Sequence, residues 1–229
     1  MTAARFSLHA TLQNFASWVL TAAYKPIVEV SPGARGLNGP VIYASNHIGY
    51  MDGPLLLCAI RQPVHVITKF EVFTQLLGAV LRRGGAVPVF WNGADRRALR
   101  HSVERLNAGE AVALFTEGSR CKGRHDWIRD GVAYLLASSE VDVVPIAVLG
   151  TRHTGQDKEM ITPFKQQTAF IVGDPIPAAD LLRGFEKPFN REDLRQIGER
   201  IRAHLQAFTL ETEVRVGIAL PTDDVSLID

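Results

Sequence analysis

Short, almost continuously apolar runs alternate along this chain with segments of helical periodicity, and this alternation constrains the fold more than any other feature. Strands that are buried on both faces have such runs, and strands that alternate with helices build a mostly parallel sheet with helices on both faces. We therefore predict an α/β fold: a mostly parallel central sheet of about seven strands flanked by helices, with an N-terminal amphipathic helix. The expected strands are residues 27–30, 41–45, 64–68, 86–90, 111–115, 143–149 and 168–172. The expected helices after the N-terminal one are residues 54–60, 71–81, 96–106, 129–138 and 191–207.

The 229 residues are expected to form one domain, because no repeat, low-complexity tract or linker rich in proline and serine divides them. We predict an amphipathic helix over 1–25 that is a candidate for membrane contact, a single domain over 26–220, and a loose acidic tail over 221–229. The 46% hydrophobic and 21% charged residues are typical of a folded protein. The 25 basic residues nearly balance the 24 acidic ones, which argues against a dedicated nucleic-acid-binding protein.

Neither the cysteines nor the histidines show a metal-binding pattern. Cys58 and Cys121 are far apart and lack a C-x-x-C partner, which predicts two reduced thiols rather than a disulfide or a zinc site. The seven histidines lack the spacing of metal ligands. The sequence therefore predicts no metal.

The N-terminal segment has two interpretations. Its uncharged run over 10–24 is shorter than the ~20 apolar residues that a membrane-spanning helix needs. Trp18 and Tyr24 are aromatic residues of the kind found at the depth of lipid headgroups. The segment is therefore either a helix packed on its own domain or a helix lying in the membrane interface. At helical spacing, one apolar stripe holds Leu8, Leu12, Phe15 and Val19.

The turn after the second expected strand carries the pattern H-x-x-x-x-D, from His47 to Asp52. This spacing lets the Asp52 carboxylate bind one nitrogen of the His47 imidazole and fix its tautomer, which leaves the other nitrogen to take a proton. Because no serine-nucleophile motif accompanies the pair, the histidine would act on a substrate hydroxyl. Each residue also has a purely structural alternative, Asp52 as a helix cap and His47 as a polar residue at a strand end.

A second turn, after the expected strand 111–115, combines an acid, a glycine, a hydroxyl and an arginine in Glu117, Gly118, Ser119 and Arg120. Glycine lets the backbone approach an anion, and the planar arginine fork fits phosphate oxygens. On its own, the pattern is weak, and a solvated turn is the better interpretation.

A basic stretch between Arg82 and Arg105 holds six arginines against two acids, with Phe90 and Trp91 between them. The stretch is either a solvated helix face or a surface that attracts anionic lipid headgroups or a phosphorylated cofactor.

Together these blocks resemble the glycerolipid acyltransferase family typified by 1-acylglycerol-3-phosphate acyltransferase. Residues 46–52 match that family's N-H-x-x-x-x-D, and residues 115–120, F-T-E-G-S-R, are similar to its F-P-E-G-T-R. Residues 144–148, V-P-I-A-V, resemble its V-P-V-A-I strand, and residues 172–176, V-G-D-P-I, resemble its late G-x-P-I turn. Order and spacing agree from about residue 27 to 207.

The resemblance implies transfer of an acyl group from a thioester to a hydroxyl of a lysophospholipid, with 1-acylglycerol-3-phosphate as the default acceptor and phosphatidate as the product. His47 would be the general base and Asp52 its orienting partner, and the phosphate end of the acceptor would lie on Glu117, Gly118, Ser119 and Arg120. Acyl-CoA or acyl carrier protein would be a co-substrate, with no cofactor. The enzyme would work peripherally at the cytoplasmic face of a membrane, without nucleic acid.

One block departs from the family pattern, because Trp91 stands where a phosphate-binding arginine is expected. Either Arg96 or Arg97 replaces that arginine, or Trp91 stacks on a bulkier headgroup such as a sugar. The alternatives are therefore acyl transfer to a different lipid or glycolipid, hydrolysis of a thioester or ester with His47 activating water, or a non-catalytic lipid-binding module of the same fold.

Overall fold

A computed structural model describes residues 2–70, 85–89 and 96–223. The helix expected over 71–81 lies outside these residues, as do Phe90, Trp91 and the last six residues of the expected tail.

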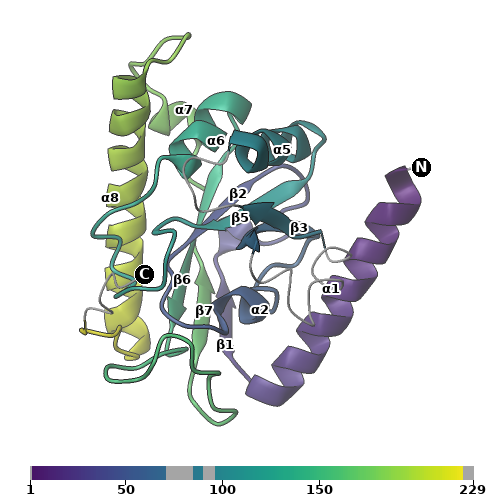
Figure 1. The fold of residues 1–229 in the computed structure, drawn as a ribbon, viewed down its shortest axis with the longest axis vertical. Helices are drawn as coiled ribbons and strands as arrows, with labels where there is room; N and C mark the ends of the chain where they lie inside the picture. Colours follow the sequence, from purple (N-terminus) through teal and green to yellow (C-terminus); the bar gives the residue numbers. More distant parts are fainter. Residues whose placement is uncertain (1, 71–84, 90–95, 224–229) are drawn as a thin grey trace.

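Within the described residues, the centre of the molecule is a seven-stranded sheet in the order β1-β7-β6-β2-β5-β3-β4 (Figure 1). Every pairing is parallel except that of β6 with β7. The prediction of a mostly parallel sheet of about seven strands is confirmed. The strands are β1 (Ile27–Val30), β2 (Ile42–Ser45), β3 (Val64–Lys69), β4 (Val87–Val89), β5 (Ala111–Phe115), β6 (Val143–Leu149) and β7 (Ala169–Val172).

Alternating side chains of the central strands enter two separate cores, one on each face of the sheet. Ile42 and Ala44 of β2 pack in one core, whereas Tyr43 packs in the other. The first core lies under α5 (Arg96–Asn107), α6 (Gly131–Ser139), α7 (Ala178–Leu181) and α8 (Arg191–Val216), and the second under α1 (Thr2–Tyr24) and α2 (Asp52–Leu56). All residues of β2 and β6 are buried, which explains their continuously apolar sequences.

Two helices differ most from the sequence prediction. Helix α8 continues to Val216 rather than ending at 207; Asn190 and Asp193 form a capping box at its start, and Gly217 ends it with φ of 72°. Helix α2 begins at Asp52 rather than at Pro54 and ends at Leu56. The structure also adds the short helix α7 and a 3₁₀ turn, η1 (Pro32–Ala34), which are too short to leave a periodic pattern.

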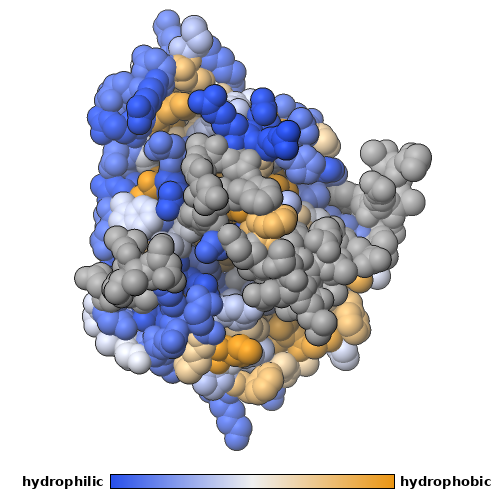
Figure 2. All heavy atoms as spheres, viewed as in Figure 1, coloured by the Kyte–Doolittle hydropathy of each residue, from blue (hydrophilic) through white to orange (hydrophobic). Residues whose placement is uncertain are grey.

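Helix α1 packs on the domain through polar residues and leaves aromatic residues on its outer face. The Gln13 carboxamide pairs with both backbone groups of Val64, with Nε2 donating to the carbonyl at 2.6 Å and Oε1 accepting from the amide at 3.0 Å. Phe15 and Trp18, by contrast, are 63% and 69% exposed. Figure 2 shows hydrophobic side chains gathered at its lower right, over the C-terminal half of α1. Among the helices described, none has the length and hydropathy needed to cross a membrane.

Candidate active site

Asn46 fixes the start of the loop that joins β2 to α2. Its side chain is fully buried and pairs with Val148 on the neighbouring strand, with Nδ2 donating to the carbonyl at 2.8 Å and Oδ1 accepting from the amide at 2.7 Å. This two-way pairing gives the loop a rigid point of departure from the carboxyl end of β2. The next residue, His47, therefore projects from a fixed position at the sheet edge.

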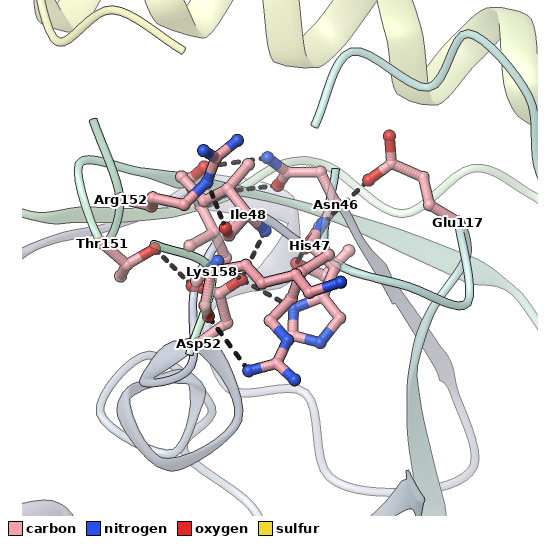
Figure 3. A network of polar contacts seen from close by, with 12 residues as sticks. Asn46, His47, Ile48, Asp52, Glu117, Thr151, Arg152 and Lys158 are labelled. Carbon is pink, nitrogen blue, oxygen red and sulfur yellow. Dashed lines mark hydrogen bonds and ion pairs between the residues drawn. The ribbon is translucent and has the colours of Figure 1, made fainter. Parts of the chain in front are cut away.

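The structure brings His47 and Asp52 together as predicted, with Nδ1 of the imidazole 2.7 Å from Oδ2 of the carboxylate (Figure 3). Asp52 is fully buried, and the same oxygen accepts from the amides of Ile48 at 2.6 Å and Gly49 at 2.9 Å. Its other oxygen accepts from the Thr151 hydroxyl. Four donors converge on this carboxylate, which is the environment of an ionised acid. We therefore assign the proton to Nδ1 of His47, which leaves Nε2 as a proton acceptor.

The His47 ring stacks on Phe115, with centroids 4.1 Å apart and planes inclined by 18°. Together with the Asp52 contact, this stacking holds the imidazole in one orientation. Asp52 does not cap α2 through its side chain, because its carboxylate is directed back to the loop. No hydroxyl or thiol of the described residues hydrogen-bonds to His47. The base is thus free to act on an external hydroxyl or on water.

Glu117 lies beneath this loop rather than at its surface. The side chain is buried, with Oε2 accepting from the His47 amide at 2.9 Å and Oε1 accepting from the His125 amide at 3.1 Å. Burial raises the pKa of the Glu117 carboxyl to about 7, and hydrogen bonds from Cys121 and the two amides oppose this shift. In this position Glu117 orients the His47 backbone, and a carboxylate there offers no attraction to a phosphate.

This buried acid predicts a pH-dependent difference in stability. The pKa of Glu117 rises from its ordinary 4.5 to about 7 on folding, so the folded chain retains a proton that the unfolded chain releases between those values. Stability from this group is present below about pH 4.5 and is lost as the pH rises to about 7. In Glu117→Gln the group no longer titrates. We expect its unfolding free energy, relative to the original chain, to rise by about 3 kcal/mol or less across that range. Urea denaturation at a series of pH values measures the difference, and a constant difference would contradict the raised pKa.

Thr151 and Arg152 follow Gly150 just after the end of β6 and complete the site, although the sequence did not single them out. Thr151 donates to Asp52, and the Cβ of any side chain at Gly49 would lie only 3.0 Å from the Thr151 carbonyl and hydroxyl oxygens. This close approach favours glycine at position 49. The Arg152 side chain is buried and donates to the Ile48 carbonyl at 2.9 Å.

Arg152 joins three separate segments around the site. Besides Ile48, its guanidinium donates to the Cys121 carbonyl at 3.3 Å and to both carboxylate oxygens of Asp223 at 3.0 Å. The first segment carries His47, the second carries the turn after β5, and the third is the start of the expected tail. The only sequence signal for this role is that Arg152 follows the end of a strand at the same sheet edge as His47.

The turn after β5 places Arg120 beside the His47 loop, since the amide of Cys121 donates to the His47 carbonyl at 2.9 Å. Gly118 adopts φ of 72°, and its amide donates to the Phe115 carbonyl at 3.1 Å. This left-handed conformation favours glycine and turns the chain sharply after the strand. Ser119 and Arg120 are both half-buried.

Arg96 and Arg97 are exposed at the start of α5. This helix follows β4, which is three strand positions from β2 at roughly 4.8 Å per position. The structure therefore does not bring these arginines into the His47–Asp52 cluster. Trp91 lies outside the described residues.

Comparison with known proteins relates the chain to lipid acyltransferases. A family model described as Acyltransferase matches residues 21–149. A chloroplastic 1-acyl-sn-glycerol-3-phosphate acyltransferase of Arabidopsis thaliana is 30% identical over 149 residues, which is 62% of this chain and 41% of that protein. A counterpart from Brassica napus is 29% identical over the same length, 62% of this chain and 42% of that protein. The chain thus spans about two fifths of the length of these curated relatives.

The fold is shared with a solved structure. The crystal structure of the 1-acyl-sn-glycerophosphate acyltransferase PlsC from Thermotoga maritima aligns with a TM-score of 0.66 at 22% identity. The alignment covers 93% of this chain and 82% of that one. The resemblance of the α/β architecture therefore extends over almost the whole chain.

Proposed function

The chain belongs to the acyltransferase family, whose model matches more than half of it, and we propose that it moves a fatty acyl group from a thioester to a hydroxyl of a lysophospholipid. The proposed acceptor is 1-acylglycerol-3-phosphate, which gives phosphatidate, and the donor is acyl-CoA or acyl carrier protein. The names of the curated relatives support this acceptor.

In the proposed reaction, Nε2 of His47 takes the proton of the acceptor hydroxyl while the hydroxyl oxygen attacks the thioester carbonyl carbon. The carbon–sulfur bond then breaks, and the imidazolium returns the proton to the departing thiolate. Asp52 stabilises the imidazolium that exists between these two steps. The acyl group passes directly to the acceptor, and His47 ends the cycle neutral.

The observation that carries this proposal is the 2.7 Å contact between Nδ1 of His47 and Oδ2 of Asp52, from which we assign the proton to Nδ1. A buried carboxylate with four donors holds Nδ1–H, and no hydroxyl or thiol among the described residues occupies the remaining nitrogen. This arrangement supplies a base without a protein nucleophile, which direct transfer between two substrates requires.

A product assay tests the proposal. The full chain is incubated with acyl-CoA or acyl carrier protein thioester and a panel of lysophospholipids, monoacylglycerol and glycolipids, and the products are identified by mass. We expect phosphatidate from 1-acylglycerol-3-phosphate together with one equivalent of free thiol. Acylation of a glycolipid alone would replace the proposed acceptor, and thiol release without any acylated lipid would identify a hydrolase.

We further propose that the enzyme works as a peripheral membrane protein with the outer face of α1 in the lipid interface. Phe15, Trp18 and Val19 are exposed on this face, and Ile161 and Phe164 of the loop between β6 and β7 are exposed as well. The ring of Phe164 lies 5.0 Å from that of Tyr24 at the end of α1, so helix and loop share one apolar surface. Lys25 and Lys165, both exposed, adjoin this surface and suit anionic headgroups.

This surface gives a testable difference in vesicle binding. Burying a Phe side chain fully is worth about 1.5–3 kcal/mol, so replacing both rings in Phe15→Ser/Trp18→Ser is expected to weaken partitioning by at least about tenfold. Sedimentation with vesicles containing phosphatidate measures the fraction of protein bound to the membrane. The matched control is Val214→Ser, because Val214 is an exposed apolar residue on α8 at 83% exposure. Equal binding by the double variant and the control would argue against membrane contact through α1.

A further inference from the structure

Arg120, in the turn after β5, contacts the loop between β6 and β7. Strand β6 lies on the opposite side of β2 from β5. The Arg120 guanidinium donates to the Glu159 carboxylate at 2.5 Å and to the Lys158 carbonyl at 3.0 Å, and it lies 5.6 Å from the centre of the Tyr50 ring. Lys158 and Glu159 belong to the segment between β6 and β7 and to none of the sequence motifs. Because the residue after Arg120 hydrogen-bonds to His47, this ion pair lies beside the candidate base.

Two hydrogen bonds hold the base of this loop, whereas the Glu159 side chain is well exposed to solvent. Thr162 donates to the Thr151 carbonyl at 2.7 Å, and Gln166 donates to the Gly150 carbonyl at 2.5 Å. Glu159 is 54% exposed and Arg120 only 21%. An ion pair with one well-exposed partner is worth about 0.2–1 kcal/mol, so a stronger anion can replace the carboxylate at small cost.

A second cationic residue, Lys158, adjoins the ion pair of Arg120 and Glu159. Lys158 is half-buried, and among the described residues its ammonium has no carboxylate partner. Its backbone carbonyl accepts from Arg120 at 3.0 Å, so Lys158 lies next to this guanidinium. A phosphate dianion bound to Arg120 would therefore have Lys158 as a second cationic partner. The singly charged carboxylate of Glu159 has no such second partner among the described residues.

We propose that Glu159 and Lys158 act as an exchange pair that selects acceptors with a phosphate dianion. In the free enzyme Glu159 holds the guanidinium of Arg120; a phosphate displaces it, and Lys158 supplies the second positive charge. A neutral headgroup would lose the ion pair without replacing its charge, so it gains less from the exchange than a phosphate does. The selection step deepens the proposed function and rests on it for its place in catalysis.

Binding of glycerol 3-phosphate tests the exchange without any acyl transfer. Isothermal titration of the full chain at about pH 8 gives its Kd. For Glu159→Gln, which removes the competing charge, we expect a Kd about two- to fivefold lower. For Lys158→Gln, which removes a charged donor, we expect a Kd about tenfold higher. KM for a short-chain lysophosphatidate should follow both shifts, whereas KM for monoacylglycerol should not.

Two matched controls keep the result interpretable. Glu199 pairs with Arg202 on α8 and is also 54% exposed, so Glu199→Gln removes an equivalent ion pair away from the site. Lys187→Gln removes an exposed lysine that pairs with Glu140 before the amino end of β6, away from the site. Both controls should leave Kd within twofold of the original chain.

Three results would overturn the exchange: weaker binding by Glu159→Gln, an equal Kd for Lys158→Gln and Lys187→Gln, or no millimolar binding by the original chain. Failure of the proposed function is a separate result, since it would appear as absent acyl transfer with the pattern of Kd values intact.

Discussion

Replacing His47 with alanine is expected to lower kcat for acyl transfer by about 10²- to 10⁴-fold, the usual contribution of a positioned general base. The change removes the imidazole that Asp52 holds, whose Nε2 is placed to take the proton of an acceptor hydroxyl. It should leave the fold intact, because the Asp52 carboxylate keeps its bonds from Ile48, Gly49 and Thr151. Rates of thiol release with a saturating short-chain acceptor measure kcat, and thermal unfolding reports the fold.

His101→Ala provides the matched control for His47→Ala. His101 is a partly exposed histidine on α5 that also lies beside a carboxylate, Glu104, at 3.4 Å. Its loss should change kcat by less than twofold. A His47→Ala enzyme that melts normally and retains more than a tenth of the original kcat would exclude His47 as the base.

The sheet was predictable from the sequence because its strands are buried on both faces. Each of the seven expected strands coincides with an observed one to within a residue or two, since short apolar runs rich in β-branched residues, such as 143–149, suit strands buried on both faces. The His47–Asp52 contact was predictable for a related reason, because one short loop joins the two residues. Local spacing thus sufficed where the partners are close in sequence.

Contacts between distant segments left no such pattern. Thr151 lies 99 positions from Asp52 and Arg152 lies 104 from Ile48, so only the assembled sheet brings them together. Glu117 follows a strand in a polar turn, which resembles a solvent-exposed position in sequence, yet the fold buries it under His47. A stripe of apolar residues on α1 was predictable, but which way this stripe faces was not. The buried Gln13 faces the domain instead, because both of its polar atoms hydrogen-bond to the Val64 backbone.

The second large effect is expected for Asp52→Asn, which removes the negative charge of this side chain and keeps its size and shape. An asparagine oxygen at the position of Oδ2 still accepts from His47, Ile48 and Gly49, and its amide can donate to the Thr151 hydroxyl oxygen, which accepts as well as donates. The loop should therefore keep its conformation. The imidazolium formed during transfer loses its counter-charge, and we expect kcat to fall by about 10²- to 10⁴-fold.

Asp52→Ala tests the other half of this argument. It leaves four donors without an acceptor in a fully buried position, at about 1–3 kcal/mol for each donor that finds no water. Chemical denaturation should therefore show a large loss of stability for Asp52→Ala and little for Asp52→Asn, although both lose activity. Asp130→Asn, at an exposed carboxylate before α6, is the control for the isosteric change. If Asp52→Asn kept its activity, the carboxylate would act only by holding the loop, and His47 would need no counter-charge in the rate-limiting step.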